Sequence, residues 1–429
     1  MEALAPTEWT WVLHSSLLIA AIYGRFTKVW SVRNLDVVLL IALTPALLLY
    51  ENASEQEPYE WVMYSVTALL SLRLIFDCRF LRRPRVEPNM NPQGLSFLCA
   101  AALIVLVVRV FVATPAPQES PEVEIAKQAS EVLERRPTEA GDADPTTTLV
   151  AAPAVALSKN LNQGDSEKLA MEIMALVAHV AIMIGLLVIG YKHFESASLG
   201  LAMAALYLMM PCTAYYVHRV THVLPAAFLI WAFVFYRRPV VAGCLLAFAS
   251  GALFSTVFLL PLWAAYYGRR RLVRFGVGLS AVGLLLTIPL LLTSLPGSLV
   301  PKFLRSMNWS VLKFSEYDPS AGLAEMLRPH FAIVFLCVFL TLTIWPRRKH
   351  LGHLIAHSTV LVVLAQLWYP ETPGVYVLWY LPMLLLVAFR PRLRHLRDTE
   401  SEVEATRLAP SPELERPSRS TVAPSPLSR

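Results

Sequence analysis

Long apolar segments with few charges recur along most of the chain. In 98–112 and 173–190, for example, nearly every residue is apolar. A helix crosses the hydrocarbon core of a bilayer with about 20 mainly apolar residues, because each residue adds about 1.5 Å. The apolar residues form continuous runs and do not alternate with polar ones, which disfavours a membrane β-barrel. The pattern therefore predicts an all-α polytopic membrane protein.

The same pattern predicts about thirteen transmembrane helices. These spans are about 9–23, 36–50, 59–76, 95–113, 169–190, 198–216, 220–236, 239–252, 253–267, 275–293, 331–345, 351–368 and 375–390. The stretch 239–267 is divided because Arg237 and Arg238 precede it and 269–271 are arginines after it. Basic loops stay in the cytoplasm, so both ends of this stretch are expected inside, as in a hairpin.

Loop charge also orients the chain. The long loop 114–168 contains ten acidic and five basic residues, and 51–58 is acidic, so we expect both outside. The N-terminus is then outside and the C-terminus in the cytoplasm. We expect an integral, multi-pass protein of a bacterial inner (plasma) membrane.

Three parts are expected along the chain. Residues 1–94 would form an N-terminal three-helix membrane module, and 95–390 the transmembrane core with its outer loops 114–168 and 294–330. Within the first loop, 121–135 has the apolar spacing of a surface helix. Residues 391–429 are rich in Pro, Ser and charge, which predicts a disordered cytoplasmic tail.

Composition narrows the function classes. The chain is 56% hydrophobic and 16% charged, well below the charge content of soluble domains. Its net charge of +6 comes mainly from helix ends, so we expect a lipid bilayer and no nucleic acid as partner. Its 5 cysteines lie singly, which indicates neither a zinc site nor a disulfide framework. Nucleotide-binding and zinc-protease motifs are absent, and few charges stand mid-span, so an ion-coupled transporter is disfavoured.

A basic cluster stands in the predicted outer turn 215–222. It contains His218, Arg219 and His222, and the outer loop 294–330 adds Lys302 and Arg305. Guanidinium groups bind phosphate oxygens well, so the cluster suits a lipid phosphate or diphosphate. The alternative is that Arg219 reaches ordinary headgroups and the histidines cap helix ends.

Transfer of a group to a hydroxyl would also need a carboxylate as base. Glu119 and Glu122 are the best placed, just beyond the fourth span. Asp142 and Asp144 stand in a segment expected to be flexible. The remaining outer candidates, each equally compatible with a solvated loop charge, are Glu124, Glu316, Asp318 and Glu371.

One segment, 201–274, resembles the middle of a known family. It has an apolar helix before Pro211, a short polar turn, a helix closed by Arg-Arg-Pro at 237–239, then Leu-Pro-Leu at 260–262 and a basic loop at 269–274. This pattern resembles the polyprenol-phosphate-sugar-dependent glycosyltransferases of the GT-C superfamily, particularly the bacterial group that includes the mannosyltransferases. The likeness extends over about 95–390.

The resemblance implies an integral membrane glycosyltransferase-like protein. It would transfer a sugar from a polyprenyl-phosphate donor on the extracytoplasmic face. The lipid phosphate would meet His218, Arg219 and His222, with Lys302 and Arg305, while Glu119 or Glu122 acts as general base. A divalent metal is implied only by likeness to some members.

The sequence departs from the family at two positions. Members often carry an Asp after the first core span, where this chain has Glu119 and Glu122, and a Lys in the second hairpin helix, where it reads Gly-Ala-Leu-Phe at 251–254. Two other functions therefore stay open: a catalytically inactive lipid-binding or scaffold protein, and a transporter of lipid-linked sugars.

Overall fold

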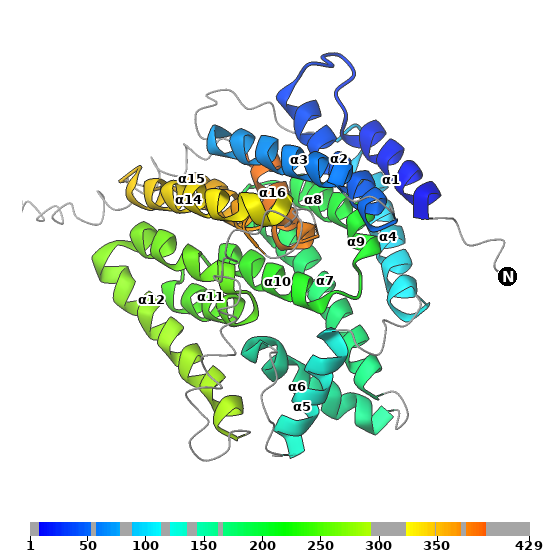
Figure 1. Cartoon of the computed structure of the whole chain (residues 1–429). Helices are drawn as coiled ribbons and strands as arrows, with labels where there is room; N and C mark the ends of the chain where they lie inside the picture. The colour runs from blue at the N-terminus through cyan, green and yellow to red at the C-terminus, as the bar shows by residue number, and fades with distance from the viewer. Residues whose placement is uncertain are drawn as a thin grey trace, which may run out of the picture. The chain divides into compact units, whose positions relative to one another are not determined.

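The structure is a computed structural model that describes residues 8–52, 57–77, 88–112, 121–134, 144–161, 166–292, 323–347, 349–369 and 375–391. Every regular element in these ranges is a helix (Figure 1). They are α1 (Glu8–Tyr23), α2 (Val32–Asn52), α3 (Glu57–Ile75), α4 (Pro92–Val112), α5 (Pro121–Glu134), α6 (Pro145–Leu161), α7 (Ser166–Lys192), α8 (Ala197–Met209), α9 (Pro211–Tyr215), α10 (Val220–Val234), α11 (Pro239–Ala252), η3 (Phe254–Phe258), α12 (Leu259–Leu292), α14 (Leu323–Ile344), α15 (Leu351–Ala365) and α16 (Val377–Phe389). The predicted all-α class is confirmed for the described chain.

Helix length limits how many of these elements can cross a bilayer. Within the described ranges, 4 are long and apolar enough: Pro92–Val112, Ser166–Lys192, Phe254–Ile288 and Met326–Ile344. Further apolar helices, such as α10 and α15, have only 15 residues, or about 22 Å at 1.5 Å per residue. The hydrocarbon core is about 30 Å thick. The chain is therefore a helical membrane protein, and the expected count of about thirteen spans is not supported.

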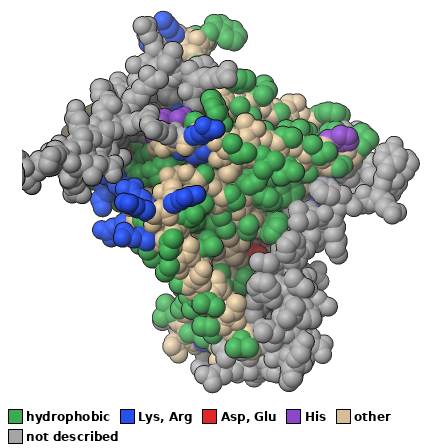
Figure 2. Space-filling model, turned by 90° about the vertical axis from the view of Figure 1, so that its left-hand side faces the viewer, with side chains coloured by type: hydrophobic (Ala, Val, Ile, Leu, Met, Phe, Trp, Pro, Cys, Tyr) green, Lys and Arg blue, Asp and Glu red, His purple; other side chains and the backbone are tan. Residues whose placement is uncertain are grey.

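Apolar side chains lie on the surface of these long helices. Phe97 and Ile104 on α4 and Ile333 on α14 are well exposed. Figure 2 shows apolar side chains spread over one face, with Lys and Arg side chains gathered at one edge. An exposed surface of this kind suits contact with lipid tails.

The basic segment 269–274, predicted as a loop between two spans, is helical. Helix α12 runs through it and is interrupted only at Gly268, whose φ of 64° is non-helical. Glycine adopts this left-handed conformation without the clash that a Cβ would bring. The chain therefore bends where the first of these spans was expected to end, but the predicted loop is wrong.

Helices α7 and α8 pack in close contact. A Cβ added to Gly190 would overlap the backbone of Gly200, and a Cβ on Gly200 would lie 2.8 Å from the carbonyl oxygen of Leu187. Small residues allow such close helix packing in membranes. These two glycines thus set the distance between the helices.

Replacing Gly190 by alanine is expected to push α7 and α8 apart. Overpacking of this kind costs about 1–3 kcal/mol, so we expect a lower midpoint of thermal unfolding in detergent. Gly276→Ala is the matched control, because among the described atoms nothing lies within 4 Å of a Cβ at that position. Equal unfolding midpoints for the two variants would refute this account.

The first three helices contact the rest of the chain. Helix α3 packs against α15, α2 contacts α16, and α1 contacts α8 and α9. The hydroxyl of Tyr23 on α1 donates to the carbonyl oxygen of Ala202 on α8 at 2.9 Å. Residues up to Pro391 form one compact unit. The division at residue 94 stays a prediction, and the tail beyond Pro391 lies outside the described residues.

Two aspartates and two arginines link α2, α3 and the end of α16. The Arg73 guanidinium bonds Asp36 at 2.9 Å and Asp77 at 2.8 Å. The other oxygen of Asp77 accepts from Arg390, which follows α16. Asp77 is fully buried. We name these four residues the ion network.

Candidate functional site

Part of the predicted outer loop 114–168 forms two helices, α5 and α6. They pack against each other and against α7 (Figure 1). Helix α5 begins at Pro121 with Glu122 and Glu124 in its first turn, which suits both the fixed φ of proline and the positive end of the helix dipole. Its apolar face, including Ile125 and Ala129, is buried. The predicted helix at 121–135 is therefore confirmed.

Glu122 and Arg219 come together at this end of the helices. Glu122 is only 6% exposed, and Arg219 is its electrostatic partner. Burial raises the pKa of Glu122, while its own backbone amide and the Arg219 guanidinium oppose that rise. Sequence reasoning expected both residues at one site, and the fold brings them within electrostatic reach.

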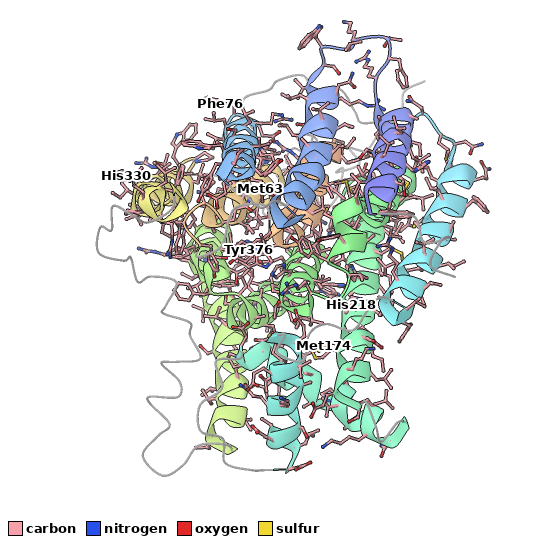
Figure 3. All side chains as sticks on the ribbon, turned by 45° about the vertical axis from the view of Figure 1, so that its right-hand side comes forward. Met63, Phe76, Met174, His218, His330 and Tyr376 are labelled. Atoms are coloured by element: carbon pink, nitrogen blue, oxygen red, sulfur yellow. The ribbon has the colours of Figure 1, made fainter. Side chains whose placement is uncertain are left out.

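In the same turn, His222 is buried and His218 is partly buried. Desolvation lowers the pKa of His218, and Lys168 adds to the effect. The His222 ring lies 5.5 Å from Tyr376 and 5.7 Å from Trp379, measured between ring centroids. In Figure 3, His218 and Tyr376 both lie between α3 and the α5–α6 pair. The predicted His218–Arg219–His222 cluster thus faces an aromatic group.

That aromatic group comes from the segment between α15 and α16. Tyr376 stacks on Trp379 with ring centroids 3.9 Å apart, and Tyr369 lies 5.3 Å from Tyr376. Trp368 lies 5.5 Å from Tyr369, and its carbonyl oxygen accepts a bond of 3.1 Å from Arg328 Nε on α14. Sequence reasoning missed this cluster.

Asp144 stands at the start of α6. Its carbonyl oxygen accepts bonds from the amide and the hydroxyl of Thr148, at 3.0 and 3.1 Å. Its carboxylate interacts electrostatically with Tyr369. Desolvation raises the pKa of Asp144 to about 8, although part of the residue remains exposed. A carboxyl group of this kind can change protonation state near neutral pH.

Helix α6 approaches α11 closely beside Asp144. A Cβ added to Gly251 would overlap the Thr146 hydroxyl and the Leu286 side chain, so glycine lets the two helices approach closely here.

Several buried polar atoms on these segments have no hydrogen-bond partner within the described ranges. They include Glu122 Oε1, Thr146 Oγ1, Thr147 Oγ1, His218 Nε2, His222 Nδ1, Trp368 Nε1 and Trp379 Nε1. Most buried polar atoms in proteins are bonded. We name the group formed by Glu122, Asp144, His218, Arg219, His222, Tyr369 and Tyr376 the candidate site. It offers donors and acceptors to a ligand that carries several polar atoms.

The structure describes only some of the predicted site residues. It unites Glu122 with His218, Arg219 and His222, whereas Glu119, Lys302 and Arg305 lie outside the described residues. Asp144, which sequence reasoning ranked below Glu119 and Glu122, belongs to the candidate site. A local signal existed, because an Asp followed by Pro is a common start of a helix.

Metal ligands do not converge at this site. Over the ranges that the structure describes, no group of three or more His, Cys, Asp or Glu side chains could hold a metal ion. Glu122 is matched with Arg219 and Asp144 with Tyr369. These donors do not fit the divalent metal implied by the resemblance.

Comparison with protein-family models, curated proteins and solved structures gives no match.

Proposed function

We propose that this chain is an integral membrane glycosyltransferase-like protein of the GT-C type, which transfers a sugar from a polyprenyl-phosphate donor. The candidate site would face the extracytoplasmic side of a bacterial inner membrane, with the N-terminus outside and the C-terminus in the cytoplasm. The observation that carries the proposal is the group of buried, unbonded polar atoms on Glu122, Thr146, His218 and His222, residues of the candidate site or beside it. A phosphate-linked sugar supplies both an anion and several hydroxyls for such atoms.

Arg219 would bind the lipid phosphate. Its guanidinium can donate two parallel hydrogen bonds to phosphate oxygens. Glu122 lies close enough to attract this guanidinium and would hold it in position before the lipid binds. The unbonded ring nitrogens of His218 and His222 would donate further bonds to the phosphate or to a sugar hydroxyl.

Asp144 would act as the general base. A base works best when its pKa lies near the working pH, and the pKa of Asp144 is about 8. The acceptor hydroxyl oxygen forms a bond to the anomeric carbon, and its proton passes to the Asp144 carboxylate. The bond from the anomeric carbon to the phosphate oxygen breaks, and its electron pair leaves with the polyprenyl phosphate. Arg219 would stabilise the charge on that leaving group.

Native mass spectrometry of the gently solubilised protein tests the lipid site. We expect a bound polyprenyl phosphate, or its hexose adduct, whose occupancy falls about tenfold in Arg219→Ala, the effect of about 1.4 kcal/mol of lost binding. Arg238→Ala is the matched control. Arg219 directly precedes α10, whereas Arg238 is an exposed arginine beyond the C-terminal end of the same helix.

Two other outcomes would support other functions. Ordinary phospholipids alone, unchanged by Arg219→Ala, would indicate a scaffold protein and contradict the proposal. Movement of polyprenyl-phosphate mannose across proteoliposomes without cleavage of the sugar–phosphate bond would indicate a transporter.

A further inference from the structure

A second polar cluster lies at the start of α15. It contains Lys349, His350, His353 and His357, whose spacing places the histidines on one side of the helix. The ring centroids of His350 and His353 are 3.7 Å apart, and those of His353 and His357 are 5.5 Å apart. We name these four residues, with Arg390, the histidine cluster.

The histidine cluster is remote from the candidate site. Helix α15 has 15 residues and is therefore about 22 Å long, with Trp368 and Tyr369 just beyond its end. Helix α16 also has one residue of each group at its ends, since Tyr376 of the candidate site precedes it and Arg390 of the histidine cluster follows it. The lengths of α15 and α16 thus separate the histidine cluster from the candidate site.

The histidine cluster closes around a glycine. A Cβ added to Gly352 would overlap the Arg390 guanidinium and lie 3.0 Å from the His350 ring. The guanidinium and the imidazole therefore approach the first turn of α15 closely. The amides of this turn point out of the helix and carry its positive dipole end.

The ionisable groups that act on His357 are all basic. They are His353, Lys349, His350 and Arg390. The charge of Arg390 is matched by Asp77, which bonds it. Lys349 and the histidines are the remaining basic groups at the start of α15.

His357 supplies an independent sign of a ligand. It is only 5% exposed, and its Nδ1 atom has no hydrogen-bond partner within the described part of the chain. A buried imidazole nitrogen without a partner is costly. An anion with several oxygens, bound between this ring, His353 and the helix start, would satisfy it.

We propose that the histidine cluster binds a phosphate group, carried either by inorganic phosphate or by a phospholipid headgroup. The imidazoles of His353 and His357 would donate to its oxygens together with the first amides of α15, apart from the His353 amide, which donates to His350 Nδ1. The Lys349 ammonium donates to the carbonyl oxygens of Thr343 and Pro346, and its third N–H would donate to the phosphate. This site is separate from the candidate site and does not depend on the proposed transferase activity.

Isothermal titration of the protein in phosphatidylcholine nanodiscs with inorganic phosphate tests the proposal. We expect saturable binding that weakens at least about tenfold in a His353→Gln/His357→Gln variant, a loss of about 1.4 kcal/mol. His330→Gln is the matched control, because this exposed histidine lies on α14. Equal affinity in the double variant and in the control would overturn the site.

Nanodiscs containing phosphatidic acid distinguish the two sources of phosphate. If the lipid headgroup is the ligand, these discs should block the titration with inorganic phosphate in the wild-type protein. Mapping of histidine carbethoxylation by mass spectrometry gives a readout on the wild-type chain should the double variant fail to fold. Phosphate, or phosphatidic acid, should slow modification of His350 and His353 and leave His330 unaffected. No protection by either would refute the proposal.

Discussion

Replacing Asp144 by asparagine is expected to slow release of polyprenyl phosphate from polyprenyl-phosphate mannose by about 10²–10⁴-fold, the usual contribution of a general base. Asparagine keeps the shape of the side chain but cannot take the proton of the acceptor hydroxyl. The measurement is chromatography of radiolabelled products formed by the reconstituted protein with membranes as the source of acceptor.

The pH dependence of this reaction follows from the same residue. Because the pKa of Asp144 is about 8, only its ionised form above that pH can accept a proton. The rate of the wild-type protein should therefore rise as pH increases through about 8. The residual rate of Asp144→Asn should lack this rise.

Glu124→Gln is the matched control for Asp144→Asn. This acidic residue is on α5 and is exposed, so its removal should leave the rate unchanged. If the wild-type protein is active and Asp144→Asn has the same rate, Asp144 is not the base. That result would direct attention to Glu122, the other acidic residue of the candidate site.

Asp77→Asn is expected to lower the free energy of unfolding by about 3–5 kcal/mol, because removal of one partner leaves a buried opposite charge uncompensated. Asp77 is fully buried and bonds both Arg73 and Arg390. Arg73 would keep Asp36, but the Arg390 side chain, which is 7% exposed, would lose its carboxylate. Equilibrium unfolding in mixed detergent micelles measures the loss.

A second variant separates charge from packing. Asp77→Asn combined with Arg390→Gln removes both members of one ion pair, so it should be more stable than Asp77→Asn alone. Asp36→Asn should cost less than Asp77→Asn, since Asp36 has a side chain 15% exposed and its partner Arg73 retains Asp77. A loss under about 1 kcal/mol for Asp77→Asn, the range of surface pairs, would show that solvent screens the network.

The ion network also gives a physical reason for the position of the N-terminal helices. Asp36 and Asp77 belong to the part of the chain predicted as a separate module, whereas Arg390 follows the last helix. The bond between Asp77 and Arg390 joins residues 313 positions apart. Destabilisation by Asp77→Asn should therefore loosen contacts between α2 and α16, which hydrogen–deuterium exchange of those helices would detect.

Local sequence determined the helices and their ends. Continuous apolar runs specify helix, the spacing of 121–135 specifies an amphipathic helix, and Gly268 permits a break that a residue with a Cβ would resist. The basic turn with Arg219 was also visible, because three neighbouring residues carry the signal. All of these features depend on residues within a few turns of one another.

Tertiary structure decided which apolar helices are long enough to cross a membrane and what meets at the candidate site. An apolar residue has the same hydropathy whether it packs against protein or faces lipid. Hydropathy could therefore not distinguish the short, buried helices α15 and α16 from helices that cross the membrane. Asp144 gains its raised pKa only because the fold removes its carboxyl group from most contact with water. The ion network has the same origin, since its charges come from helices distant in sequence. Local sequence therefore determines where helices form in this chain, and contacts between distant helices determine which polar side chains meet.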